Sequence, residues 1–266
     1  WIIWNLTRGR NHVTDITNAS RTMMLNLHTK DWDDLILDIL EIPRKLLPEI
    51  QPSAGIFGDA TLGLFEESSL PISGVMGDQQ SALFGQGCIS SGSAKNTYGT
   101  GSFLLLNTGE KLTVSTEGLI TIPAWGIDSE ITYALEGSIF STGAAVQWLK
   151  DGLGIIEEIE DVETLASSVS TNGGVFVVPA FSGLGAPYWD MYARGSIFGL
   201  TRGSNSGHIS RATLESIAFQ SRDVLESMQK DFGQKISTLR VDGGGSENRL
   251  LMQMQADILG VPIERS

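Results

Sequence analysis

Residues 238–259, TLRVDGGGSENRLLMQMQADIL, decide the fold class of this chain. A short β-branched and apolar run at 238–241 meets three glycines at 243–245, and the apolar spacing from Asn248 to Leu259 is that of an amphipathic helix. A strand that turns through glycines into a helix is typical of α/β domains, and such a turn leaves backbone N–H groups free to face an anion. The sequence therefore predicts an α/β domain with a phosphate-binding turn. The turn is not a Walker A loop, because no Gly-Lys-Ser or Gly-Lys-Thr follows it.

The rest of the chain supplies further strands and helices. Strand-like runs occupy 97–107, 118–123, 131–135 and 175–179, and helical patterns occupy 141–150, 162–169 and 208–228. Turn-forming residues separate the first three runs, as in an antiparallel meander. Hairpin-like strands followed by alternating helices and strands predict a mixed sheet with flanking helices, which is an α/β fold of the ribonuclease H-like or actin-like ATPase type.

The composition excludes several functional classes. The chain carries 18 Lys and Arg against 31 Asp and Glu, and the net charge of -13 repels nucleic-acid backbones and anionic lipid surfaces. No apolar run reaches the roughly 18–20 residues that a membrane-spanning helix needs. The single cysteine, Cys88, has no partner for an internal disulfide, which favours a reducing compartment. We therefore expect a cytoplasmic protein that has no membrane-spanning segment and binds no nucleic acid.

Asp78 is the first candidate for chemistry. The run 72–77 predicts a buried strand that enters a glycine turn, and the apolar residues 82–84 predict the start of a helix. Asp78 follows Gly77 and precedes two glutamines, so a proton acceptor lies beside amides that both donate and accept. This combination suits a polyhydroxyl substrate. The alternative is that Asp78 only caps the helix that follows it.

Residues 98–101, Tyr-Gly-Thr-Gly, lie in a predicted hairpin turn between two apolar strands. The glycines would let backbone amides approach a phosphate, and the Thr100 hydroxyl offers another donor. Considered alone, the tetrapeptide is equally well explained as a plain β-turn.

Four segments taken together resemble the FGGY carbohydrate kinase family, which belongs to the actin-like ATPase superfamily. They are GDQQSALFGQ at 77–86, AKNTYGTG at 94–101, PAFSGLGAPYWD at 179–190, and a signature of GSIFGL at 195–200 with HI at 208–209 and ATLE at 212–215. Their order along the chain matches the family, and the resemblance covers almost all 266 residues.

The resemblance implies ATP-dependent phosphorylation of glycerol to sn-glycerol 3-phosphate, in glycerol catabolism, with ATP and Mg²⁺. Asp78 would be the general base for the terminal hydroxyl and a partner of the metal ion, Gln79 would hydrogen-bond the glycerol hydroxyls, and Phe103 would cover the carbon backbone. Five further residues would contact the nucleotide: Thr100, Gly143, Gln147, Gly244 and Asn248. Phosphoryl transfer depends mainly on positioning and electrostatic stabilisation, and these residue types suit it.

The same resemblance implies a domain organisation. Residues 1–83 would be the C-terminal part of the first, glycerol-binding FGGY domain, and residues 84–266 most of the second, ATP-binding domain, with the active site in the cleft between them. The full-length enzyme would be a homo-oligomer, a dimer or a tetramer. Two alternatives stay open: an FGGY kinase for a pentulose or hexulose, and a non-catalytic actin-like module that binds a nucleotide.

The sequence also departs from the family. The Asp-Gly-Thr phosphate loop and the Arg-Glu pair and Tyr that grip glycerol lie upstream of anything present here, and residues 261–266 alternate like a strand cut off before its partner. We therefore expect a fragment that does not turn over glycerol by itself. Some bacterial members bind fructose 1,6-bisphosphate through a Gly-Gly-x-Arg segment, whereas residues 61–68 contain no arginine and two acids. We expect the parent enzyme to be insensitive to this inhibitor.

Overall fold

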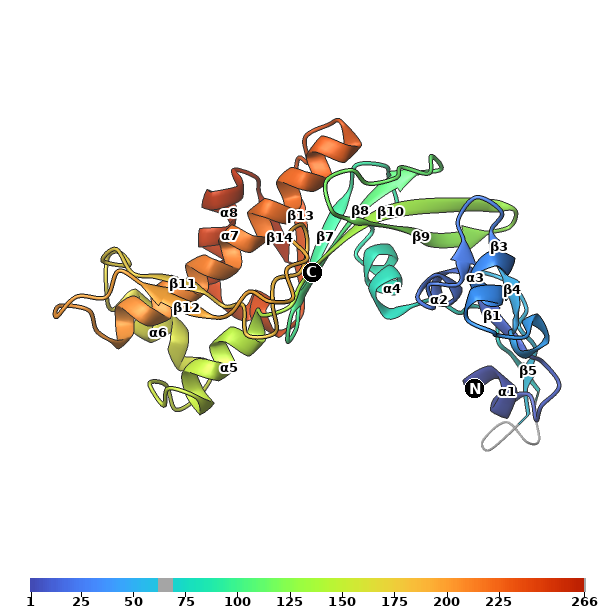
Figure 1. Cartoon of the computed structure of the whole chain (residues 1–266), viewed down its shortest axis with the longest axis horizontal. Coiled ribbons are helices and arrows are strands. Elements are labelled where there is room, and N and C mark those ends of the chain that lie inside the picture. Colours follow the sequence, from blue (N-terminus) through green and yellow to red (C-terminus); the bar gives the residue numbers. More distant parts are fainter. Residues whose placement is uncertain (62–68, 266) are drawn as a thin grey trace.

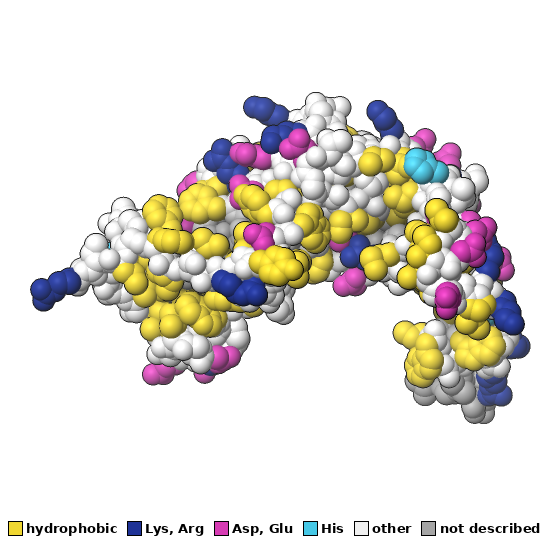
Figure 2. Space-filling view, viewed as in Figure 1, with side chains coloured by type: hydrophobic (Ala, Val, Ile, Leu, Met, Phe, Trp, Pro, Cys, Tyr) yellow, Lys and Arg dark blue, Asp and Glu magenta, His cyan; other side chains and the backbone are white. Residues whose placement is uncertain are grey.

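The computed structural model describes residues 1–61 and 69–265, and the chain forms an arch (Figure 1). The first arm contains the N-terminal residues, a twisted sheet spans the centre, and the longest helices lie in the second arm. Figure 2 shows hydrophobic side chains along the concave inner side of both arms. Most of the segment 61–68, which carries the expectation about fructose 1,6-bisphosphate, lies outside the described residues.

The first arm is built from short elements. They are α1 (Ile2–Leu6), β1 (Val13–Asp15), α2 (Ile16–Ser20), β2 (Leu25–Asn26), β3 (Asp31–Trp32), α3 (Asp34–Ile39), the 3₁₀ turn η1 (Arg44–Leu46), β4 (Glu49–Gln51), β5 (Asp59–Ala60) and β6 (Leu70–Pro71). Elements this short cannot hold themselves together through their own backbone hydrogen bonds, so side-chain contacts carry much of the structure.

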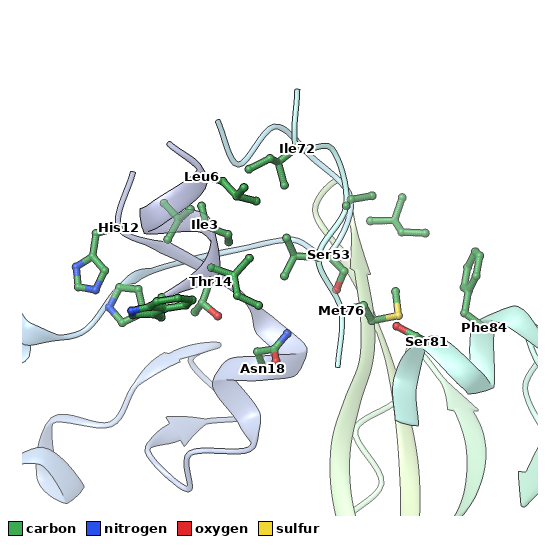
Figure 3. A pocket seen from close by; sticks show the side chains of 18 of the residues that line it. Ile3, Leu6, His12, Thr14, Asn18, Ser53, Ile72, Met76, Ser81 and Phe84 are labelled. Carbon is green, nitrogen blue, oxygen red and sulfur yellow. The ribbon is translucent and has the colours of Figure 1, made fainter. Parts of the chain in front are cut away.

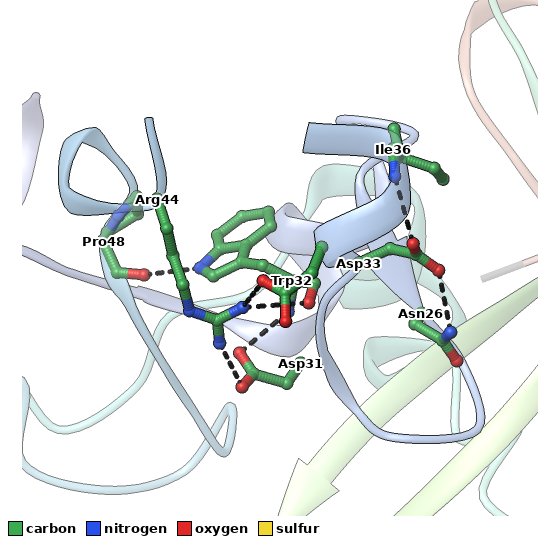
Figure 4. A network of polar contacts seen from close by, with 8 residues as sticks. Asn26, Asp31, Trp32, Asp33, Ile36, Arg44 and Pro48 are labelled. Atoms are coloured by element: carbon green, nitrogen blue, oxygen red, sulfur yellow. Dashed lines mark hydrogen bonds and ion pairs between the residues drawn. The ribbon is translucent and has the colours of Figure 1, made fainter. Parts of the chain in front are cut away.

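A polar network around α3 shows how such contacts act (Figure 4). The Arg44 guanidinium binds the carboxylates of Asp31 and Asp34, and the Trp32 indole donates a hydrogen bond of 2.8 Å to the Pro48 carbonyl. Asp33 caps the helix, because its carboxylate accepts a 3.1 Å hydrogen bond from the backbone N–H of Ile36. These bonds fasten the N-terminus of α3 to the segment that follows the helix.

The centre and the second arm hold the longer elements. They are α4 (Asp78–Gly85), β7 (Ala94–Tyr98), β8 (Ser102–Gly109), β9 (Ile120–Ile127), β10 (Glu130–Ile139), α5 (Gly143–Asp151), α6 (Asp161–Ser167), β11 (Phe176–Val178), β12 (Ser196–Phe198), α7 (Ser206–Phe232), β13 (Leu239–Asp242), the 3₁₀ turn η3 (Gly244–Glu247), α8 (Arg249–Leu259) and β14 (Ile263–Arg265). The helix α7 begins two residues before the expected start, because Asn205 and His208 form a capping box there.

The central sheet has the strand order β14-β13-β7-β8-β10-β9. Strands β14, β13 and β7 run parallel, and the remaining neighbours are antiparallel, which confirms the predicted mixed sheet with flanking helices. The expected meander is wrong in two respects. The run 97–107 contains the turn that separates β7 from β8, and β10 rather than β9 pairs with β8. Residues 133–139 of β10 are all buried, so this strand must lie inside the sheet and β9 takes the edge.

The two faces of the sheet pack against different helices. Ala94, Tyr98 and Leu104 point to the face that α7 and α8 cover, where they join the largest apolar core. Lys95 and Leu105 point to the opposite face, because successive residues of a strand alternate. Helix α4 covers that second face and buries Leu83 against it, and Figure 1 shows this helix on the concave side of the arch.

The segment before α4 differs from the prediction. Residues 72–77 do not form a strand; they make only one isolated bridge, between Gly74 and Ala54, and a few irregular backbone bonds to residues 53–58. Helix α4 begins at Asp78 rather than at 82–84. A contact with a distant part of the chain accompanies this start: the Gly77 backbone N–H donates a 2.8 Å hydrogen bond to the Thr17 hydroxyl, and the helix begins at the next residue.

No helix among residues 1–61 and 69–265 combines the length and the apolar character needed to cross a bilayer.

Candidate active site

A cavity of about 980 Å³ opens between the β7–β8 turn, α5, α6, α7 and the start of α8. The five residues expected to contact a nucleotide all line it: Thr100, Gly143, Gln147, Gly244 and Asn248. They come from three segments that lie far apart in the sequence. The structure thus brings all five together, and their contacts with a nucleotide remain predictions.

The β7–β8 turn is tied to the start of α5 through backbone atoms. The carbonyl oxygens of Gly99 and Thr100 accept hydrogen bonds of 3.0 and 2.9 Å from the N–H groups of Gly143 and Ala144. A side chain at Gly143 would place its Cβ 2.6 Å from the Gly99 oxygen. Close packing therefore requires this glycine, whatever the cavity binds.

Gly244 is different, because nothing in the fold requires it. A Cβ atom built there would meet no atom within 4 Å, and the residue is exposed at the rim of the cavity. Its neighbour Gly243 has a φ of 82° and lies against Tyr98, so that glycine is needed for the turn itself. A glycine without a packing reason at the edge of a cavity fits close approach by a ligand.

The glycine turn does not lead directly into the last helix. The 3₁₀ turn η3 follows it, and α8 begins at Arg249 with Asn248 as its N-cap. The Asn248 side-chain oxygen accepts a 2.8 Å hydrogen bond from the Leu251 N–H. This bond occupies one of the two acceptor positions of the oxygen and turns it toward the helix, and the amide N–H₂ group of Asn248 is the donor that this side chain offers to a ligand.

The rest of the cavity combines an apolar wall with a few polar groups. Its apolar lining includes Val146, Ile159, Val162, Leu214, Ile217 and Leu251. Gln147 lies at the surface, where its amide donates a 2.6 Å hydrogen bond to Asp151. An apolar slot with a polar rim is the usual environment for a flat heterocyclic ring.

Asp78 lies on the other side of the sheet, at the start of α4. Gly77 is the N-cap of this helix and Asp78 is its first residue, so the alternative that Asp78 only caps the helix is wrong. The Asp78 side chain is exposed, and its Oδ2 accepts a 3.1 Å hydrogen bond from Gln79 Nε2. Its position in the first turn favours a negative charge.

Gln79 and Phe103 join this second group through β7 and β8. The Gln79 Oε1 atom accepts a 2.6 Å hydrogen bond from the ammonium of Lys95 in β7. Phe103 is paired with Thr97 in the sheet and therefore lies on the face toward α4. Asp78, Gln79 and Phe103 do not line the 980 Å³ cavity in the part of the chain that the structure describes. One hairpin, β7–β8, connects the two groups.

Two family models match the chain, and together they include the residues around the 980 Å³ cavity and those beside α4. The N-terminal domain of the FGGY family of carbohydrate kinases matches residues 1–85, and the C-terminal domain of the same family matches residues 94–266. The chain belongs to the FGGY family of carbohydrate kinases.

Known FGGY kinases resemble this chain along its whole length. It is 62% identical to glycerol kinase 2 of Thermotoga maritima over 265 residues, which are 100% of this chain and 53% of that protein. A crystal structure of Plasmodium falciparum glycerol kinase with ADP has a TM-score of 0.92 and 42% identity, and the match covers 100% of this chain and 53% of that one. A ligand-bound xylulose kinase from Lactobacillus acidophilus has a TM-score of 0.85 and 26% identity, covering 99% and 54%.

These similarities confirm the predicted family and the actin-like ATPase fold. The chain spans about half the length of the curated relatives it matches.

Three charged residues on the face of the central sheet that α4 covers were not predicted from the sequence. Lys95 and Glu136 are fully buried, and Asp242 is half-buried. Burial lowers the pKa of the Lys95 ammonium to about 8, against the opposing effect of Asp242, Glu136 and Asp78. Glu136 binds the Arg21 guanidinium through two bonds of 2.8 and 3.0 Å. For Lys95 and Glu136 the available signal was a charge inside an otherwise uncharged stretch of sequence, as in AKNTY and ALEGSI.

The family implies Mg²⁺, and the oxygen donors near α4 fit it. The Oδ1 atom of Asp242 is buried and has no hydrogen-bond partner among the described residues. The exposed Asp78 carboxylate acts on the same lysine as Asp242. No group of three or more His, Cys, Asp or Glu side chains suited to a metal occurs in residues 1–61 and 69–265. Mg²⁺ needs no such group, because one or two carboxylates, waters and substrate phosphates usually hold it.

A second cavity, of about 1050 Å³, separates the first arm from α4 (Figure 3). Figure 3 shows apolar side chains such as Ile3, Leu6, Ile72, Met76 and Phe84 around it. None of the expected site residues lines it. The polar side chains His12, Thr14, Asn18, Ser53 and Ser81 also line it, but because it holds none of the expected site residues we assign it no catalytic role.

Proposed function

We propose that the full-length gene product phosphorylates glycerol with ATP and forms sn-glycerol 3-phosphate, as a cytoplasmic enzyme of glycerol catabolism. The observation that carries the proposal is the β7–β8 hairpin. Its turn brings Thr100 to the rim of the 980 Å³ cavity, and its strands present Lys95 and Phe103 to the side where Asp78 and Gln79 lie. A phosphate donor and an alcohol acceptor would thus meet across one short element.

The percentages of sequence identity favour glycerol over a ketose as the substrate. Identity is 62% with the Thermotoga maritima glycerol kinase and 26% with the Lactobacillus acidophilus xylulose kinase. A substrate pocket depends on a few placed polar groups, so the higher identity gives the better support for a shared substrate. An assay with both acceptors separates glycerol from the ketose.

In the proposed reaction, Asp78 accepts a hydrogen bond from the terminal hydroxyl of glycerol and takes its proton as the phosphoryl group arrives. Gln79 donates to a hydroxyl of the same substrate, and the Phe103 ring covers its carbon backbone. Thr100 contacts the terminal phosphates, and Gly143 and Gly244 leave room for the phosphate chain. Gln147 and Asn248 face the adenosine end, where the apolar wall receives the base.

Asp78 would also hold Mg²⁺, which supplies neutralising charge to the phosphate oxygens when it is bound. The residues around it act independently of the ion: they orient the hydroxyl and limit its movement. Positioning of this kind and electrostatic stabilisation together supply most of phosphoryl transfer catalysis, since the transition state is loose.

The domain assignment and the assembly belong to the same proposal. Residues 1–83 would contribute to the glycerol-binding domain and residues 84–266 to the ATP-binding domain. The full-length enzyme would be a dimer or a tetramer, and sedimentation of the gene product measures this.

The test is an assay of ADP formation by the full-length gene product with glycerol, xylulose and no acceptor. We expect activity with glycerol that the Asp78→Asn variant reduces by about 10²- to 10⁴-fold, because the base is lost. ADP binding should stay within twofold of the wild type, since Asp78 lies outside the nucleotide cavity. Activity with xylulose alone, or no activity with either acceptor, contradicts the proposal.

A further inference from the structure

Lys95 is the most unusual side chain on the α4 face. It is fully buried as the second residue of β7, yet it carries an ammonium group. Lysine is almost never fully buried unless a partner compensates its charge. No carboxylate among the described residues lies within the 4.0 Å of an ion pair, although Asp242, Glu136 and Asp78 are close enough to act on it.

Two uncharged oxygens take the place of an ion-pair partner. The ammonium donates hydrogen bonds of 2.6 Å to Gln79 Oε1 and 2.7 Å to Thr97 Oγ1. Taking an ammonium group out of water costs free energy, and two uncharged acceptors offset only part of that cost. The stability of the fold therefore gives no reason for a lysine at this position.

The contact with Gln79 has a definite chemical consequence. An ammonium group only donates hydrogen bonds, so the amide of Gln79 must turn its oxygen toward Lys95. The amide nitrogen then points away, and it donates a 3.1 Å hydrogen bond to Asp78 Oδ2. The second hydrogen of this nitrogen is left for another acceptor.

We propose that Lys95 is a positioning residue that fixes the Gln79 amide so that it offers only N–H donors to Asp78 and to the substrate. This inference rests on the proposed function and deepens it. A substrate hydroxyl that accepts from Gln79 keeps its own proton free, and that proton is then directed to the Asp78 carboxylate. Lys95 acts through Gln79 and touches no reacting atom.

A double-mutant cycle in the full-length gene product tests the inference. The variants are Lys95→Met, Gln79→Ala and the double mutant, with the exposed Lys235→Met as a matched control. We expect Lys95→Met to lower kcat/KM for glycerol by about 10- to 100-fold, mainly through KM, and to leave KM for ATP within twofold. In the Gln79→Ala background, Lys95→Met should change kcat/KM by less than threefold, because the amide through which Lys95 acts is absent.

A Gln79→Glu variant covers the case in which Lys95→Met does not fold. It keeps an acceptor for Lys95 and removes the donor, so kcat/KM should fall at least as far as in Gln79→Ala. An additive cycle, or full activity of Gln79→Glu, overturns the inference while wild-type glycerol kinase activity stands. A wild type without activity on glycerol overturns the proposed function itself, and the two failures are therefore distinct.

Discussion

Arg21 and Glu136 form a two-bond ion pair that joins the first arm of the arch to the central sheet. Arg21 ends α2, and Glu136 lies in β10, 115 residues further along the chain. The carboxylate is fully buried, whereas 42% of the arginine side chain is exposed. Loss of Arg21 therefore leaves a buried carboxylate without a partner, whereas loss of the Glu136 charge leaves an arginine that is partly exposed to water.

Removing Arg21 should cost more stability than removing the charge of Glu136. Arg21→Met leaves a buried carboxylate without its partner, which we expect to lower the free energy of unfolding by about 3 kcal/mol. Glu136→Gln leaves an arginine that can reach water, and the expected loss is about 1 kcal/mol. Urea unfolding of both variants measures the difference, and equal losses contradict it. The double variant should be more stable than Arg21→Met alone.

Lys95 gives the fold a dependence on alkaline pH. Its pKa is about 8 in the folded protein against an ordinary value of 10.5, so the unfolded chain binds more protons between these values. The free energy of unfolding therefore rises with pH across this window. The charged and titratable groups that act on the ammonium are Asp242, Glu136, Asp78 and Cys88.

A comparison with Lys95→Met isolates this effect, because all other groups are shared. Between pH 8 and 10.5 the free energy of unfolding of the wild type should rise by about 3 kcal/mol relative to that of the variant. Below pH 8 the difference between the two free energies of unfolding should be constant. Urea unfolding at pH 7, 9 and 10.5 provides the measurement, and a pH-independent difference shows that the lysine titrates normally.

Gly244 and Gly143 should respond differently to alanine. Gly244→Ala meets no atom within 4 Å, so it should leave thermal stability unchanged and weaken ADP binding by roughly fivefold, which is about 1 kcal/mol. Gly143→Ala places a Cβ 2.6 Å from a carbonyl oxygen and should destabilise the turn by about 1–3 kcal/mol. Calorimetric titration with ADP and thermal unfolding measure both effects.

Gly85→Ala is the matched control for Gly244→Ala. It is equally free of neighbours within 4 Å, and it lines the other cavity. Its ADP affinity should equal that of the wild type. A loss of ADP affinity in Gly85→Ala, or unchanged affinity in Gly244→Ala, argues against a nucleotide at the glycine turn.

Cys88 should be unreactive in the native protein. Its thiol is fully buried, and burial raises its pKa, which reduces the fraction present as thiolate. A chromogenic disulfide reagent at pH 8 should modify it only as fast as the protein unfolds. Rapid modification without denaturant contradicts the burial, and the urea-unfolded protein serves as the positive control.

The sequence was sufficient for the α/β class, the long helices and the group of residues around the 980 Å³ cavity. Glycine turns, amphipathic spacing and the FGGY motifs are local patterns, and each was visible without the structure. The strand predicted at 72–77 failed because its backbone bonds depend on where residues 53–58 lie. The start of α4 depends in the same way on Thr17, which is 60 residues distant.

The charged residues under α4 could not be predicted for a related reason. Lys95 and Glu136 belong to different strands, and only the register of the sheet places them on one face with Leu105 between them. Strand order is a long-range property, and it was also the part of the sheet that the sequence predicted wrongly. A charge within an apolar strand indicates a special site but does not identify its partner.

The β7–β8 hairpin also limits how this chain can change during evolution. The five-residue strand β7 sets the distance along the chain from Lys95, which binds Gln79, to the turn that contains Thr100. Inserting or deleting one residue there would reverse the faces of all the side chains beyond it. Changes of substrate should therefore arise by exchanging side chains around α4 and β8, while the length of this strand stays the same.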